Sequence, residues 1–383
     1  MNNPSTITKA VQRNLQPIRE RAGLTTDELE KRLILGPGWI RRYESGEATL
    51  TLDILMAILS QTGATLDELS TGIPTFHGAH DFERFLAAEQ KGEDLLVAFR
   101  YSQFDAEYIL ERCKIDEFNE ILRTLRDKLS QTSESETDLS EAIKRDAVAN
   151  AFLKAVDLWP HINPSDLWYF IIYRAYCDPF NHPADYARLD FAQSWKRTGG
   201  WALEEVLVRH YAPFLETKGI KIFIADAAMK REFLDEVITQ ERLESDKVDV
   251  VLVGKERSRY KFFGVVHVKS SFAERRTDDV PMSHALAQAG YTSPLWTMDC
   301  KSSPSPRPHN RGELGQANGA RNAKRRDIED EGYFTGCFSY NTNTVPSDTN
   351  LPPERQIQVC DFTDPNDAFS RFIIDRWQKF RSA

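Results

Sequence analysis

The sequence predicts an α/β (α+β) fold, in which a central mixed sheet flanked by helices follows an all-α N-terminal region and an all-α middle region. Through most of the first 195 residues, apolar residues recur at helical spacing. After Gly199-Gly200 the pattern changes to one amphipathic helix and then to short apolar runs typical of strands. The expected domains are residues 1–73, 74–194 and 195–383.

The composition is that of a protein with hydrophobic cores and no membrane anchor. Of 383 residues, 41% are hydrophobic and 28% charged, with no run of eighteen apolar residues and no signal-like leader. The five cysteines are scattered and lack the spacing of a zinc site, so we expect reduced thiols and a cytoplasmic protein. The net charge of -9 argues against a protein that coats nucleic acid, but an enzyme needs only one basic cleft.

The first domain is predicted to consist of short helices. An amphipathic segment covers residues 7–22, and Thr25 with Glu28 forms the capping box of a second helix. A third helix lies within residues 36–47 and ends at a glycine. Two more helices are expected, at residues 51–62 and 65–69.

Five short helices with a tight turn over residues 7–70 resemble the Xre/Cro-like helix-turn-helix fold. The resemblance implies DNA contacts from the third helix, where Arg41 and Arg42 are the candidates. However, Gly36-Pro37-Gly38 stands where the family carries base-reading side chains, and it offers the major groove almost no donors or acceptors. A protein-protein or dimerisation module is therefore an equal alternative.

The middle region is predicted to be helical and is a candidate dimerisation region. Apolar residues keep helical spacing at 82–86, 108–110, 118–122 and 147–158, and residues 168–173 indicate a buried helix. The polar stretch 129–137 is typical of a flexible linker.

In the third domain, a helix precedes a series of strands. The helix covers residues 201–215, and further helices are expected at 283–289 and 365–381. The expected strands are residues 220–224, 248–253, 261–269, 295–300, 333–340 and 356–360.

Two of these strands form a hairpin that gathers charged side chains. Asp249 begins one strand and Lys269 ends its partner, and His267 shares a face with Lys269 because side chains two apart in a strand point the same way. Asp249 can bind a magnesium ion, while Lys269 can orient a water and stabilise negative charge, which is what phosphodiester hydrolysis needs. In isolation, such residues are more often ordinary charged strand ends.

The residues after the hairpin carry a second resemblance. Lys269-Ser270-Ser271-Phe272-Ala273-Glu274-Arg275 is similar to the signature of type II restriction endonucleases that read CCGG or CCNGG, closest to the BsaWI-like branch with a PD-(D/E)xK core. Residues 277–281 also fit this branch. The resemblance implies that Lys269 is catalytic and that Glu274 and Arg275 read cytosine and guanine, as their hydrogen-bonding groups allow. Arg276 is a candidate for a further guanine or phosphate contact.

The second acid of that core departs from the pattern. His267 occupies its position and is a poor magnesium ligand, so it is either a ligand or water-positioning group or a hydrogen-bonded structural histidine. The candidate supplementary acid, and second metal ligand beside Asp249, is Glu204 on the helix before the sheet. Glu205 competes with it, and either residue could simply lie on the wet face of that helix.

Two other charged features are weaker candidates. Asp299-Cys300-Lys301 has acid-x-Lys spacing but no acid-led partner strand, so a sheet edge explains it. A basic run is either a solvated loop and helix or an arm that contacts phosphates: Arg307, His309, Arg311, Arg321, Lys324, Arg325 and Arg326.

The sequence therefore predicts a magnesium-dependent type II restriction enzyme that cuts double-stranded DNA at a short palindrome with a CCGG-type core. Because a palindrome has two-fold symmetry, we expect a homodimer or higher homo-oligomer, and the host needs a cognate DNA methyltransferase. One alternative is a DNA-binding transcriptional regulator with a degenerate, non-cutting nuclease domain. Another is a nonspecific or repair nuclease, which leaves Glu274 and Arg275 unexplained.

Overall fold

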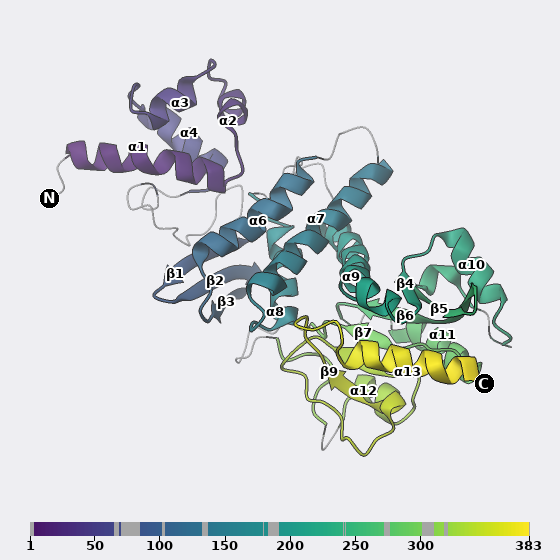
Figure 1. Ribbon diagram of the computed structural model, residues 1–383. Helices are drawn as coiled ribbons and strands as arrows, with labels where there is room; N and C mark the ends of the chain where they lie inside the picture. Colours follow the sequence, from purple (N-terminus) through teal and green to yellow (C-terminus); the bar gives the residue numbers. More distant parts are fainter. Residues whose placement is uncertain are drawn as a thin grey trace. The chain divides into compact units, whose positions relative to one another are not determined.

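The protein is described here by a computed structural model (Figure 1). It describes residues 4–64, 69, 85–101, 104–131, 137–178, 180–182, 191–239, 241, 243–271, 276–300, 310–317 and 321–382. Internal contacts divide the chain into two units, unit 1 with residues 1–136 and 172–195, and unit 2 with residues 137–171 and 196–383. These units cut the chain at points other than the three domains expected from the sequence, which stay a prediction.

The N-terminal part of unit 1 is a small helical module. Its helices are α1 (Pro4–Arg21), α2 (Thr26–Arg32), α3 (Trp39–Glu44) and α4 (Leu52–Thr62). The predicted capping box is confirmed, because the Glu28 amide donates to the Thr25 hydroxyl while the Glu28 carboxylate accepts from the Thr25 amide. The helix expected at residues 65–69 lies almost entirely outside the described residues.

The module has a core of its own, with two buried charged residues beside it. Leu15, Leu29, Ile40 and Ile58 are fully buried in it. The Arg19 guanidinium donates to Glu44 (2.5 Å) and to the Leu24 carbonyl (2.8 Å), which ties α1 to α3. The Glu30 carboxylate accepts from the amides of Gly38 and Ile40, so it satisfies the first turn of α3 in place of a side-chain cap.

The prediction of an all-α middle region is wrong for residues 86–110. They form a three-stranded antiparallel sheet of β1 (Leu86–Lys91), β2 (Asp94–Tyr101) and β3 (Phe104–Leu110). The first turn needs only two residues and has Gly92 at φ +64, a conformation that glycine adopts without strain. Leu95, Val97 and Phe99 are every second residue of β2 and are buried, as in a strand with one covered face. The helical spacing suggested by the sequence is therefore not realised here.

The helices that follow β3 in the sequence agree with the prediction. They are α6 (Ile115–Leu129), α7 (Thr137–Leu158) and α8 (Pro164–Trp168), followed by a π-helix, η1 (Tyr169–Ala175). The expected buried segment is confirmed for residues 168–171. The core of the expected linker, residues 132–136, lies outside the described part of the chain.

Unit 2 contains the predicted mixed sheet, with six strands in the order β4-β5-β6-β7-β8-β9. The first three, β4 (Ile220–Phe223), β5 (Val250–Glu256) and β6 (Arg259–Lys269), run antiparallel. From β6 onward, β7 (Leu295–Thr297), β8 (Cys337–Ser339) and β9 (Ile357–Val359) are parallel. The carboxyl end of β6, with Lys269, therefore lies at the same edge as the carboxyl ends of β7 to β9.

Helices cover both faces of this sheet (Figure 1). On one face, α10 (Ala227–Asp235) and α11 (Arg276–Gln288) pack against Val251 and Val265. On the other, the Trp377 ring of α13 (Ala368–Ser382) lies against Phe263 and Gly254, where a Cβ would clash with it. The other elements of the unit are α9 (Phe191–Glu216), α12 (Ala323–Glu329) and the turns η3 (Ser245–Lys247) and η5 (Pro353–Arg355).

The predicted fold class, a mixed sheet flanked by helices, is confirmed for this unit. Within the described part of the chain, none of the helices combines the length and the apolar character that crossing a lipid bilayer requires.

Candidate active site

The β5–β6 hairpin brings Asp249 and Lys269 together. Val250 pairs with Val266, so Asp249, directly before β5, lies beside the carboxyl end of β6. The Lys269 Nζ lies 2.5 Å from Asp249 Oδ2, and the Val268 amide donates to the same oxygen at 2.8 Å. Both side chains are only 8% exposed. The predicted proximity of these two residues is confirmed.

The hairpin presents this pair to the face that α11 covers. Every second side chain from Asp249 along β5 points to that face, which gives Asp249, Val251 and Val253. On the partner strand the same face carries Val265, His267 and Lys269. On α11, Asp279, Met282 and Leu286 have the spacing of one helix face, and the last two pack in the same hydrophobic cluster as Val251 and Val265.

This packing places a third charged residue, Asp279, beside Lys269. The sequence analysis gave Asp279 no role. Its carboxylate is fully buried, with Oδ2 3.5 Å from the Lys269 Nζ. One lysine thus faces two buried carboxylates. Two features of the sequence could have indicated Asp279. It lies within the stretch 277–281 that fits the family motif, and it begins the apolar face of α11 that packs on the sheet.

His267 is buried beside this cluster but lies in a different chemical setting. Its Nε2 is 2.9 Å from the Ser293 hydroxyl, and its Nδ1 is 3.9 Å from Asp279 Oδ1. Burial lowers the pKa of His267 to about 4, with Asp249 opposing and Lys269 reinforcing this shift. The imidazole is therefore neutral at physiological pH. This arrangement favours the interpretation as a hydrogen-bonded structural histidine.

Glu204 faces the cluster from α9. Its pKa is raised to about 8, first by burial and then by the negative charge of Asp249, while Lys230, Lys269 and Arg145 oppose the rise. Such mutual influence requires proximity to the pair at the hairpin.

The neighbouring Glu205 is occupied elsewhere. It accepts from Arg209 at 2.8 Å and lies 3.6 Å from Arg145 of α7. Arg209 also donates to Asp146 and Asn150 of α7, at 2.6 and 2.8 Å. These contacts engage Glu205 with α7, whereas it is the pKa of Glu204 that responds to the charge of Asp249.

The donor set suits a hard divalent cation. Asp249, Asp279 and Glu204 all supply oxygen, the ligand that magnesium and calcium prefer. Within the described ranges, no three acidic, histidine or cysteine side chains are already grouped as metal ligands. Instead the Lys269 ammonium lies between two carboxylates, 2.5 Å from Asp249 and 3.5 Å from Asp279.

The predicted recognition residues are only partly described. Glu274 and Arg275 lie outside the described residues, as does the side chain of Arg276. In the helical module, Arg41 and Arg42 are exposed on α3, and the Arg42 guanidinium lies 4.6 Å from the centre of the Trp39 ring.

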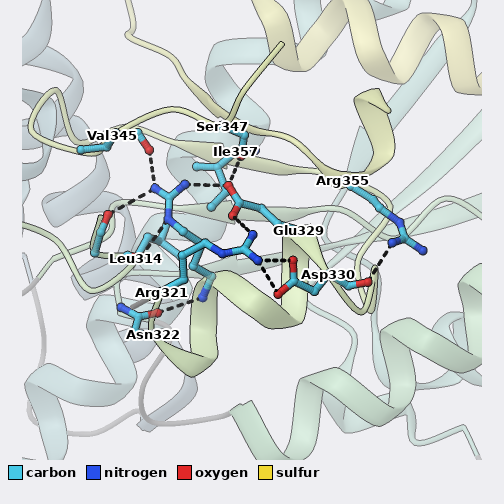
Figure 2. Close-up of polar contacts among 11 residues, drawn as sticks. Leu314, Arg321, Asn322, Glu329, Asp330, Val345, Ser347, Arg355 and Ile357 are labelled. Carbon is cyan, nitrogen blue, oxygen red and sulfur yellow. Dashed lines mark hydrogen bonds and ion pairs between the residues drawn. The ribbon is translucent and has the colours of Figure 1, made fainter. Parts of the chain in front are cut away.

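The basic run proves largely structural where it is described (Figure 2). Arg325 is fully buried and donates to the carbonyls of Leu314, Gly315 and Val345, and to the Glu329 carboxylate. Arg321 bridges Glu329 and Asp330. For Arg325 both alternatives, a solvated helix and an arm that contacts phosphates, are wrong, because its buried guanidinium links α12 to two neighbouring loops. Residues 307 and 309 lie outside the described residues.

Asp299 also has a structural setting, consistent with its dismissal from the sequence. Its carboxylate accepts from the Glu313 and Leu314 amides and from the Thr344 hydroxyl. Burial raises its pKa to about 6, and these hydrogen bonds oppose the rise. It braces the loops at the carboxyl edge of the sheet.

Two family models match the chain, one over each of the regions discussed. The BsaWI restriction endonuclease type 2 family matches residues 229–363, and a helix-turn-helix domain family matches residues 13–71. Both resemblances predicted from the sequence are confirmed.

Known proteins extend the match. The chain is 38% identical over 238 residues to the type II restriction enzyme AgeI of Thalassovita gelatinovora, covering 60% of this chain and 83% of that enzyme. It is also similar to the crystal structure of the specific restriction endonuclease AgeI-DNA complex, with a TM-score of 0.63, 31% identity, and coverage of 73% of this chain and 99% of that one. The chain therefore belongs to the type II restriction enzymes, the site-specific DNA endonucleases.

Proposed function

We propose that Asp249, Asp279, Lys269 and Glu204 form the active site at which this enzyme hydrolyses double-stranded DNA. The observation that carries the proposal is one buried lysine within 2.5 and 3.5 Å of two buried carboxylates. Burial strengthens the field of these charges because water does not screen them. Family membership adds that the substrate is DNA and that a divalent metal ion is needed.

The roles follow from the chemistry of each side chain. The three carboxylates would hold the metal ion, which polarises the scissile phosphate and lowers the pKa of a bound water. The Val268 amide keeps Asp249 oriented. Lys269, once released from Asp249, is positioned to stabilise the negative charge that develops on the phosphate.

Magnesium is the metal we propose. The candidate ligands are all oxygen, and the neutral His267 is engaged with Ser293. Asp279 then serves as the second acid that the hairpin lacks, so the histidine in the usual position does not imply a dead enzyme.

We further propose a short palindromic target with a CCGG-type core. Glu274 accepts from cytosine N4 and Arg275 donates to guanine O6 and N7, and Arg276 adds a guanine or phosphate contact. Two-fold symmetry of the target calls for two active sites, hence a homodimer or higher oligomer in the cytoplasm, alongside a cognate DNA methyltransferase. Arg41 and Arg42 of the helix-turn-helix module would add contacts to DNA.

The proposal is tested by incubating purified protein with plasmid DNA and magnesium, then sequencing the fragment ends. Discrete fragments ending at one CCGG-containing palindrome are expected. Glu274→Ala and Arg275→Ala should lose this site selection. A smear would indicate a nonspecific nuclease, and no cleavage under any divalent metal would favour the regulator interpretation.

A further inference from the structure

A second lysine, Lys230 of α10, lies next to the proposed active site. Helix α10 begins at Ala227, is capped by Asp226, and packs on the sheet through Leu234. Lys230 and Leu234 are four residues apart, so they share one face of the helix. Lysine is uncommon on an inward face, because its charge must be compensated there.

The ammonium group of Lys230 is compensated by the backbone next to Asp249. It donates to the Val248 carbonyl at 2.5 Å, one residue before the candidate metal ligand. Helix α10 also packs against η3, the turn that leads into this segment. The contact therefore fixes the backbone from which the Asp249 side chain projects.

This position gives Lys230 a task distinct from that of Lys269. Asp249, Asp279 and Glu204 repel one another when ionised, and Lys269 must leave Asp249 for a cation to enter. The contact of Lys230 with the Val248 carbonyl, which lies outside the ion pair, keeps the backbone of Asp249 in place at that moment. Groups that orient ligands from outside commonly change metal affinity or activity by roughly 10- to 100-fold.

We propose that Lys230 is a positioning residue of the nuclease site, which holds the backbone that carries Asp249 in place for the cation without itself touching the metal or the DNA. This inference rests on the proposed function, because it takes Asp249 as a cation ligand. A phosphate-binding lysine at the surface would be the alternative.

The test compares full-length wild type with Lys230→Gln, which keeps a hydrogen-bond donor but loses the charge, and Lys230→Arg, which restores the charge. Lys221→Gln is the matched control, because Lys221 is exposed on β4 and lies over the Tyr260 ring. Cation affinity is measured without cleavage, as the magnesium concentration that gives half of the full rise in unfolding temperature. DNA affinity is measured by fluorescence anisotropy in EDTA.

We expect Lys230→Gln to need roughly 10- to 100-fold more magnesium, in the thermal measurement and for half-maximal cleavage. Lys230→Arg should recover part of this loss, and Lys221→Gln should match wild type. DNA affinity in EDTA should stay unchanged.

Three results would overturn the inference. Unchanged magnesium dependence in Lys230→Gln excludes a positioning role, and weaker DNA binding in EDTA would make the lysine a phosphate contact. If Lys230→Gln fails to fold, Lys230 is needed for the stability of the fold and not for positioning Asp249. Wild-type protein that does not cleave DNA would instead refute the proposed function, so the two failures are distinguishable.

Discussion

Two buried charge clusters in unit 2 are built in opposite ways. Around Arg325, charges balance: two arginines face Glu329 and Asp330, and three backbone carbonyls accept from Arg325 (Figure 2). Around Lys269, acids outnumber the base, because Asp249 and Asp279 both face one ammonium group and Glu204 approaches them.

The difference separates a cluster that braces the fold from one suited to act. The Arg325 guanidinium is fully buried and uses four of its five N–H donors within the fold, so it is not available to a ligand. An excess of buried carboxylates is costly unless a cation compensates it. The second cluster therefore has a physical reason to take up a divalent ion, and the first has none.

The largest effect is expected from Lys269→Ala and Asp249→Ala. Each removes a partner of the central ion pair, and we expect cleavage to fall by at least about 100- to 1000-fold, because the charge stabilisation at the phosphate or the hold on the cation is lost. Single-turnover cleavage of a plasmid measures this. Circular dichroism must show an intact fold, and undiminished cleavage by folded Lys269→Ala would eliminate the proposed site.

Arg325→Met should have the opposite effect, a loss of stability without a loss of cleavage. It removes one of the two arginines paired with the buried Glu329 carboxylate and leaves Arg321 as the other, so we expect a loss of up to about 3 kcal/mol in the free energy of unfolding. Urea unfolding measures the loss. The folded fraction should still cleave DNA at the wild-type rate, and a stable but inactive variant would show that this cluster contributes to catalysis.

Asp279→Asn sharpens the contrast within the active cluster. Loss of one carboxylate should raise the magnesium requirement by roughly tenfold or more, because the amide is a weaker ligand. The matched variant is His267→Gln, which keeps a group able to hydrogen-bond with Ser293. If His267→Gln raised the magnesium requirement more than Asp279→Asn does, His267 and not Asp279 would be the second metal ligand.

The smallest expected effect is a pH dependence. Because burial raises the pKa of Glu204 to about 8, its ionised fraction grows as the pH rises through 8. At limiting magnesium, cleavage should therefore increase between pH 7 and about pH 9 and then level off. Glu204→Gln should cleave more slowly without this increase. An identical pH profile in the variant would assign the rise to another group.

The sequence predicted the parts of the molecule whose determinants are local. The Thr25–Glu28 capping box needs residues three apart, and the Asp249–Lys269 pair needs one hairpin, whose register is regular from Val250 to Leu252, next to the pair. Asp279 could be placed only once the packing of α11 on that hairpin was known, because a single acid in a motif does not reveal where its helix lies.

The errors have the opposite origin. The strands at residues 86–110 are short, and the middle one has a continuous apolar run from Leu95 to Phe99, so the Gly92 turn was the local signal that distinguished them from a helix. Arg325 sits in a basic run that is typical of a solvated surface, and its burial depends on carbonyls 10 to 20 residues away in sequence. Such contacts are set by tertiary packing and leave no periodic signal.

The central claim is that Asp249 and Asp279 hold a divalent cation where the Lys269 ammonium now lies. Crystals soaked in manganese test it directly through anomalous diffraction. We expect one peak within coordination distance of both carboxylates, about 2.0 to 2.2 Å from their oxygens, with Lys269 displaced from Asp249. A peak elsewhere, or Lys269 still bound to Asp249 at saturating manganese, would contradict the account.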